Sequence, residues 1–176
     1  MNIRRVVTGF DEQGKSVFAS DSAVEPLELD ALAGWKFYDM WGEDDVPSLP
    51  RPGDKPPMAT YFPPTTGHRF SFSVIPPEGT AAPEGIDEDR AQAEVEAALP
   101  GLMAHLEPDG MHTTDTIDFE IVLRGEVYLQ LDDGVETLLR PGDTVVQNGT
   151  RHVWRNAGSE PVLLAVFMVG ARREQS

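Results

Sequence analysis

The feature that most constrains this 176-residue chain is a series of short segments between Leu102 and Val169 that are separated by turn residues. The turns are Pro108-Asp109-Gly110, Asp132-Asp133-Gly134, Pro141-Gly142-Asp143 and Ala157-Gly158-Ser159. Gly, Pro, Asp and Ser end strands because they adopt turn conformations at low cost. Short strands at this regular spacing predict an antiparallel sandwich or barrel.

A two-residue period in Ile117 to Leu123 indicates how one of these strands is oriented. Its odd positions are all apolar, whereas Asp118 and Glu120 occupy the alternate face. Side chains of a strand point alternately to opposite faces, so one face of this strand is apolar and the other polar. We expect the polar face inside a ligand-holding barrel. The apolar face then needs cover from the N-terminal segment or from a second subunit.

The N-terminal part, residues 1–83, is predicted to contain strands followed by a proline-rich wrap. The β-prone runs are Arg4 to Thr8, Ser16 to Ala19, Trp35 to Trp41 and Arg69 to Ile75. The first two flank the sequence GFDEQGK, whose turn residues predict a hairpin. Frequent prolines from Val46 to Pro83 exclude long helices there.

One helix is predicted, over residues 87–99. Asp87 is its expected N-cap and Pro100-Gly101 its stop. Its expected apolar stripe consists of Ala91, Val95, Ala98 and Leu99. Residues 102–170 form the expected core barrel, in which Val162 to Val169 is apolar throughout and is predicted to be buried on both faces. The length predicts a single domain over residues 1–176.

Composition limits the partners. Fourteen Lys and Arg against thirty Asp and Glu give a net charge of −16, which disfavours nucleic acid and anionic membrane surfaces. The chain has no cysteine, so a metal must use His and carboxylate ligands. The N-terminal sequence MNIRRVVTGF lacks the apolar run of a signal peptide, and we expect a cytoplasmic protein.

The segment Gly9 to Ser16 matches the phosphate-binding pattern GxxxxGKS, but its context argues against that function. Asp11 and Glu12 would face the phosphates, and no helix-length pattern follows Ser16. We therefore expect a hairpin turn and no nucleotide cofactor.

Two stretches carry the chemistry: GMHTTDTIDFEIVLRG (110–125) and PGDTVVQNGTRHVWRN (141–156). They resemble the two motifs of the cupin family. The matching positions are Gly110, His112, Asp118 and Gly125 in the first motif, and Gly149, His152 and Asn156 in the second. The resemblance implies an all-β fold, a single antiparallel β-barrel of the double-stranded β-helix (jelly-roll) type with an N-terminal strand extension and one short inserted helix. It also implies a homodimer.

Three positions depart from the family pattern. Thr114 replaces the second His, Asp118 replaces the commoner Glu, and Gln147 replaces a Pro. The metal ligands that remain are His112, Asp118 and His152, a set suited to Fe, Mn, Ni or Zn. The alternative is a metal-free pocket in which these histidines hydrogen-bond to Asp118 and Glu120.

Further candidate site residues follow from strand parity. Glu120 is a candidate general base, with a solvated or structural role as the alternative, and His152 is the second candidate catalytic residue. Trp154, Thr114 and Asn156 are the candidate substrate-binding residues, Trp154 through stacking or as a core residue. Trp35, Phe37 and Trp41 would form either a lid or ordinary packing. His105, on an expected strand, matches no motif position.

The expected function is that of a cupin-fold enzyme acting on a small molecule, with a divalent metal on two His and one carboxylate. The reaction would be of dioxygenase, isomerase, cyclase or lyase type. A metal-free module that binds a small ligand without catalysis is the alternative. A third reading is a metal-free isomerase or cyclase that uses His and carboxylate groups alone.

Overall fold

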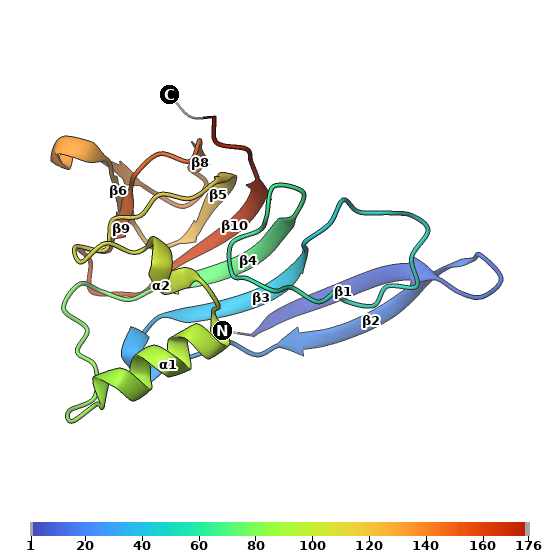
Figure 1. Ribbon diagram of the computed structural model, residues 1–176, viewed down its shortest axis with the longest axis horizontal. Coiled ribbons are helices and arrows are strands. Elements are labelled where there is room, and N and C mark those ends of the chain that lie inside the picture. The colour runs from blue at the N-terminus through green and yellow to red at the C-terminus, as the bar shows by residue number, and fades with distance from the viewer. Residues whose placement is uncertain (1, 175–176) are drawn as a thin grey trace.

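The computed structural model describes residues 2–174, and its strands form three antiparallel sheets (Figure 1). A two-stranded sheet consists of β1 (Ile3–Phe10) and β2 (Ser16–Val24). The five-stranded sheet has the order β3 (Lys36–Glu43), β4 (His68–Ile75), β10 (Val162–Gly170), β5 (Thr116–Arg124) and β8 (Thr144–Gln147). The three-stranded sheet has the order β7 (Glu136–Leu139), β6 (Val127–Gln130) and β9 (Val153–Arg155). The predicted all-β class is confirmed.

The five- and three-stranded sheets pack face to face over one apolar cluster. Its buried members are Ile75, Val122, Val127, Leu139, Val162 and Leu164. These residues come from strands of both sheets, which do not join into a continuous hydrogen-bonded cylinder. The arrangement is a two-sheet jelly roll, in agreement with the predicted double-stranded β-helix.

Helices cover one open end of the two sheets. The predicted helix is present as α1 (Glu88–Ala98), and Asp87 caps it by accepting a hydrogen bond from the Arg90 amide at 3.1 Å. Its buried residues Val95 and Leu99 pack on η1 (Asp30–Leu32) and α2 (Leu102–His105). A second short 3-10 turn, η2 (Asp132–Gly134), follows β6.

Two details of the helical region differ from the sequence prediction. Ala98 is exposed, so the buried stripe of α1 is narrower than expected. The segment that starts at Leu102 forms a helical turn, α2, where the sequence predicts a strand. Its buried residue Leu102 packs against Val95 and Leu99, a contact that the sequence pattern does not indicate. His105 therefore lies on a helix.

The N-terminal hairpin is longer than predicted and projects from the body as an arm (Figure 1). Its turn lies within the GFDEQGKS segment, where the Asp11 carboxylate accepts hydrogen bonds from the amides of Gln13 at 2.9 Å and Lys15 at 2.8 Å. The Asp11 carboxylate thus accepts hydrogen bonds from backbone amides that a bound phosphate would need. The predicted turn is confirmed, and the absence of nucleotide binding stays a prediction.

The strand parity predicted for β5 is confirmed. Asp118 and Glu120 are each 5% exposed, whereas Phe119 and Ile121 on the opposite face are 47% and 42% exposed. The polar face therefore looks into the jelly roll, and the apolar face forms the outer surface of the five-stranded sheet.

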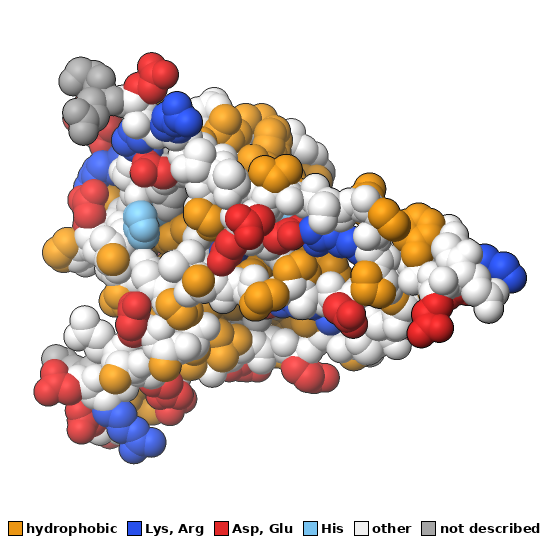
Figure 2. All heavy atoms as spheres, turned by 45° about the vertical axis from the view of Figure 1, so that its right-hand side comes forward, with side chains coloured by type: hydrophobic (Ala, Val, Ile, Leu, Met, Phe, Trp, Pro, Cys, Tyr) orange, Lys and Arg blue, Asp and Glu red, His pale blue; other side chains and the backbone are white. Residues whose placement is uncertain are grey.

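The base of the hairpin covers only one half of this outer face. Ile3 and Val24 pack there against Tyr38, Val74 and Leu163 of the sheet. The other half, which we call the open outer face, consists of Phe70, Phe119, Ile121, Val146 and Phe167. Exposed hydrophobic side chains also lie along the arm (Figure 2), among them Phe18, which is 78% exposed.

Strand β10 was predicted to be buried on both faces, which holds only for its first half. Val162, Leu163 and Leu164 are buried, whereas Phe167 is 39% exposed on the open outer face. The hairpin base covers the beginning of β10 and stops short of its end. Within residues 2–174, no helix combines the length and the apolar character needed to cross a membrane.

Candidate functional site

A cavity of about 140 Å³ lies between the two sheets, and we call it the inner cavity. Four His, Asp and Glu side chains line it: His112, Asp118, Glu120 and His152. Apart from these groups and Ser73, its lining is apolar or aromatic; it consists of Leu32, Trp35, Phe37, Tyr61, Phe62, Ile75, Leu102, Leu106, Trp154, Leu164, Val166 and Met168. A small apolar cavity with a few convergent polar groups is the usual form of a small-molecule site.

The two carboxyl groups reach the inner cavity because they are alternate residues of β5. Asp118 pairs with Met168 of β10 and Glu120 with Val166, so both extend over the centre of the sheet. Asp118 Oδ1 and Glu120 Oε2 are buried without a hydrogen-bond partner. Buried polar atoms are normally paired, so two unpaired oxygens in one cavity indicate a place for a ligand or water.

The two histidines meet across a single β-bridge. The His112 amide donates to the His152 carbonyl at 2.9 Å, the His152 amide donates back at 3.0 Å, and the ring centroids lie 4.2 Å apart. Gly149 makes this approach possible, since it adopts φ +59° and a Cβ there would stand 2.9 Å from the Thr114 carbonyl oxygen. A motif glycine is thus required for steric reasons.

Backbone carbonyls fix the orientation of both rings. His112 Nδ1 faces the Gly110 carbonyl at 3.3 Å, and His152 Nδ1 faces the Thr150 carbonyl at 2.9 Å. A neutral imidazole nitrogen that faces a carbonyl carries the proton, which leaves Nε2 as the acceptor. Each ring therefore offers one lone pair for a ligand.

Burial shifts the pKa values of all four groups. It raises the pKa of Glu120 to about 8, with the nearby Asp118 carboxylate adding to the effect. It raises the pKa of Asp118 to about 6 against a hydrogen bond from Thr116. Burial and then the neighbouring His112 lower the pKa of His152 to about 4, and burial also lowers the pKa of His112. At neutral pH, Glu120 is a protonated acid and both imidazoles are neutral.

The predicted metal set is only partly assembled. His112, Asp118 and His152 line the same cavity, and the Nε2 atoms of the histidines suit a divalent ion. Yet no three His, Asp or Glu side chains of residues 2–174 stand close enough together to hold one. The arrangement therefore does not fit a three-ligand site, and two imidazoles remain as potential ligands.

The three predicted substrate-binding residues lie in different environments. Trp154 lines the inner cavity, edge-on to the ring of His152 at 6.4 Å. Thr114 is buried and its hydroxyl contacts that of Thr116 at 2.8 Å, one step removed from Asp118. The Asn156 side chain is instead engaged with the backbone: its amide donates to the carbonyls of Ile75 and Glu160, and its oxygen accepts from the Gly158 amide.

The aromatic residues predicted as a lid divide into two groups. Trp35 and Phe37 line the inner cavity and stack at 5.9 Å, whereas Trp41 lies with Val6 and Met40 on the hairpin side of β3. His105 contacts the ring of Phe62 and the Thr113 carbonyl, outside the inner cavity.

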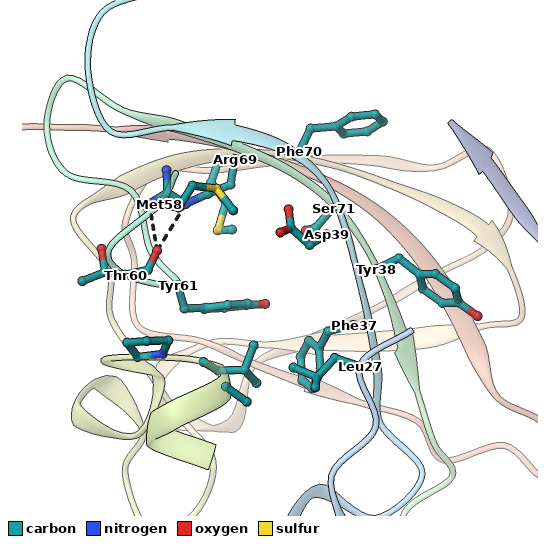
Figure 3. Close-up of a pocket in the computed structure, with 14 residues that line it drawn as sticks. Leu27, Phe37, Tyr38, Asp39, Met58, Thr60, Tyr61, Arg69, Phe70 and Ser71 are labelled. Carbon is teal, nitrogen blue, oxygen red and sulfur yellow. Dashed lines mark hydrogen bonds between the residues drawn. The ribbon is translucent and has the colours of Figure 1, made fainter. Parts of the chain in front are cut away.

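Sequence reasoning missed Tyr61 and Phe62, which complete the aromatic wall of the inner cavity. They lie in the proline-rich wrap, where no periodicity indicates a face. Arg69, which is 3% exposed, holds the wrap in place by donating to the Thr60 carbonyl at 2.8 Å (Figure 3) and to Asp44 at 2.5 Å. The Tyr61 amide then donates to the Pro100 carbonyl at the end of α1 at 2.9 Å.

Comparison with protein families gives a match for residues 102–169, to the family described as "Cupin domain". The matched segment begins with α2 and ends in β10, so it includes both sequence motifs and all four His, Asp and Glu residues of the inner cavity.

Curated relatives match over a shorter segment. Phomopsin biosynthesis cluster protein C' of Diaporthe leptostromiformis is 52% identical over 46 residues, which are 26% of this chain and 24% of that protein. The cupin-domain-containing oxidoreductase fogC of Aspergillus ruber is 39% identical over 46 residues, 26% of this chain and 23% of the relative. The matched part therefore spans about a quarter of the length of these relatives.

A solved structure extends the likeness to nearly the whole fold. The Schizosaccharomyces pombe Cnp3 cupin domain superposes with a TM-score of 0.50 over 95% of this chain and 87% of that domain, at 10% sequence identity. Such low identity speaks for the fold alone.

Proposed function

We propose, on the premise that the chain belongs to the cupin superfamily through residues 102–169, that it is a small-molecule enzyme that moves a proton in its inner cavity. The observation that carries the proposal is the pair of unpartnered carboxyl oxygens, Asp118 Oδ1 and Glu120 Oε2, in a cavity shared with two imidazoles. A cavity that contains strongly perturbed titratable groups is a candidate active site.

Glu120 is the group that gives and takes the proton. The pKa of about 8 lies close to neutral pH, where a general acid or base is most effective. As an acid, Glu120 donates its proton to a substrate oxygen or carbon, and as a carboxylate above pH 8 it accepts one. The neighbouring Asp118 favours the protonated form of Glu120, because two adjacent carboxylates repel each other.

His152 orients the substrate for this transfer. Its Nδ1 is occupied by the Thr150 carbonyl, so Nε2 accepts a hydrogen bond from a substrate hydroxyl. The ring stays neutral because its pKa is near 4. Trp154 adds an apolar surface beside that ring. Isomerisation, cyclisation and elimination each include such a proton transfer, which accompanies the new ring bond in a cyclisation and the departure of a leaving group in an elimination.

The test measures proton exchange directly and needs no knowledge of the natural substrate. The protein is incubated in D₂O with a panel of small enolisable ketones and hydroxyaromatics, and deuterium incorporation is read by mass spectrometry. Glu120→Gln should slow incorporation by about a hundredfold or more. Glu126→Gln, a matched change of an exposed glutamate that pairs with Arg140, should leave it unchanged. Equal rates in both variants would refute the proposal.

A metal-dependent oxidoreductase is the second candidate, favoured by the imidazole pair and by relatives named oxidoreductases. His112 and His152 would hold the ion, which would supply redox or Lewis-acid chemistry. The missing third ligand is the reason for ranking it second. Chelator treatment separates the two candidates: deuterium incorporation that survives it supports proton transfer without metal, and loss that Fe(II) restores supports the metal.

A further inference from the structure

A second cavity, of about 330 Å³, adjoins the inner cavity, and we call it the outer cavity. The two share three lining residues, Phe37, Tyr61 and Met168, and so lie side by side. The rest of the outer cavity is mainly apolar, with Leu27, Met58, Ala98, Leu99 and Pro100 among its lining residues. Neither the sequence motifs nor the proton-transfer site uses this space.

One row of cross-strand neighbours connects the two cavities along the inner face of the five-stranded sheet. Asp39 of β3 pairs with Ser71 of β4, Ser71 pairs with Val166 of β10, and Val166 pairs with Glu120 of β5. Figure 3 shows the oxygens of Asp39 and Ser71 directed toward the space in front of Tyr61, whereas the rings of Phe70 and Tyr38 point away from it.

Each cavity contains a buried hydrogen-bonding atom of this row that lacks a partner. Ser71 Oγ lines the outer cavity and Glu120 Oε2 the inner one, and both are buried and unpaired. Their residues lie two strands apart, which corresponds to roughly 10 Å at a strand spacing of about 4.8 Å. Val166, between them, contributes only an apolar surface.

Tyr61, which lines both cavities, is held in position by hydrogen bonds. Tyr61 is held through the Thr60 carbonyl, which receives two hydrogen bonds from the buried Arg69, and through a hydrogen bond between its own hydroxyl and Ser73. Burial raises the pKa of Tyr61 to about 12, so the hydroxyl keeps its proton. The ring of Tyr61 thus presents an apolar surface to both cavities, because its one polar atom is already engaged.

We infer that the two cavities are the two ends of one binding site for an elongated molecule that carries a hydroxyl group at each end, about 10 Å apart, with an apolar body between them. One hydroxyl binds Glu120 in the inner cavity and the other binds Ser71 in the outer cavity. Hydroxyl groups suit both ends because the Ser71 hydroxyl both donates and accepts, and the unpaired Glu120 oxygen is buried in the inner cavity, where a carboxyl group binds a hydroxyl. Asp39 pairs with Lys55 and so presents no free charge to the outer end. The assignment rests on the proposed function for the identity of the reacting end.

The experiment measures binding of straight-chain 1-alkanols and α,ω-alkanediols, from butane to dodecane, by calorimetry and by the fluorescence of Trp35 and Trp154, which line the inner cavity. Diol affinity should exceed that of the matching 1-alkanol only for chains long enough to reach Ser71. Ser71→Ala should weaken binding of these long diols about threefold to tenfold and leave the 1-alkanols unchanged.

A matched pair of substitutions on α1 tests whether long diols occupy the outer cavity. Ala98→Phe fills it and should weaken binding of long diols without affecting butanol, whereas Ala97→Phe, at the neighbouring exposed position that does not line the cavity, should change neither. The inference is overturned if diols gain nothing over alkanols at any length, if Ser71→Ala weakens both series equally, or if no probe binds. Its failure is distinct from that of the proposed function: deuterium incorporation into small substrates depends on Glu120 and not on Ser71.

Discussion

His112 and His152 exchange both backbone hydrogen bonds across one isolated bridge, which holds their imidazole rings 4.2 Å apart at the edge of the inner cavity. The two residues are 40 positions apart in the sequence, and each belongs to a different motif. The bridge sets the approach of the two backbones, and the hydrogen bonds between each Nδ1 and a backbone carbonyl orient the rings. Substitution of either ring leaves the bridge itself in place, which makes single His variants clean probes of function.

The first prediction concerns stability and pH. The folded pKa of Glu120 is raised from 4.5 to about 8, so between these values the folded state binds a proton that the unfolded state has released. Stability must therefore fall as pH rises through this range. Between pH 4 and 6.5 the lowered pKa of His152 acts in the opposite direction, so the Glu120 effect is clearest above pH 6.5.

Urea unfolding at pH 6.5 and 8.5 measures this effect. The wild-type protein should lose about 1–2 kcal/mol between the two pH values. Glu120→Gln should abolish the loss, and Glu126→Gln should retain it. An unchanged loss in Glu120→Gln would assign the pH dependence to another group.

The second prediction concerns metal. We expect weak binding of Ni(II) or Zn(II) that is lost in His112→Ala and in His152→Ala, because the two Nε2 atoms are the available ligands. Asp118→Asn should leave the affinity unchanged, since the carboxylate is not part of a three-residue cluster in the described chain. Calorimetric titration gives the affinities. A strong loss in Asp118→Asn would mean that the carboxylate moves to complete the originally predicted site.

The third prediction concerns Asn156. Its side chain makes three hydrogen bonds to backbone groups, two within the turn that follows β9 and one to Ile75 at the end of β4, so Asn156→Ala leaves buried partners unsatisfied. We expect a loss of about 1–3 kcal/mol in unfolding free energy. Asn148→Ala, at an exposed position, is the matched control. A stable Asn156→Ala protein with weakened ligand binding would instead support the substrate-binding role expected from the sequence.

The fourth prediction concerns self-association. We propose that the open outer face packs against the same face of a second copy in a two-fold dimer. This face continues the surface that the hairpin base already covers, and its exposed members on β5, β8 and β10 are all uncharged. For a chain of net charge −16, a contact free of carboxylates is the one least opposed by repulsion between copies.

Light scattering checks the mass against the 19.3 kDa of one chain. The wild-type protein should scatter as a dimer, and Phe119→Asp combined with Phe167→Asp should yield a monomer. Val135→Asp, which changes an exposed apolar residue next to η2, should remain dimeric. A monomeric wild type at micromolar concentration contradicts the proposal.

The parts of the fold that follow a period were predictable. The alternation in β5 identified which face holds Asp118 and Glu120, and Asp87 with Pro100-Gly101 marked the helix within one residue. The site residues that were missed lie where no period exists. Tyr61 is in the proline-rich wrap, and its place depends on Arg69, which is bonded to carbonyls distant in sequence.

The motif spacing predicted where the motif residues lie better than it predicted what their side chains contact. His112 and His152 meet as the motifs implied, but Asn156, at an equally well-matched position, is engaged with the backbone. Spacing fixes where a residue falls along the strands and loops. Which atoms its side chain reaches depends on the turn around it, here the one closed by the Gly158 amide, and that geometry is not encoded in the spacing.

The alternation of polar and apolar residues in β5 gives the two faces of this strand different surroundings. Its pairing with β10 sets Phe119 opposite Phe167 outside and Glu120 opposite Val166 inside. A slip of one residue in this pairing would turn the phenyl and isoleucine side chains into the cavity and the two acids onto the surface. The register between β5 and β10 thus keeps the carboxyl groups of the proposed reaction on one face of β5 and the side chains of the proposed dimer contact on the other. A substitution on one face can therefore change one proposed property and preserve the other.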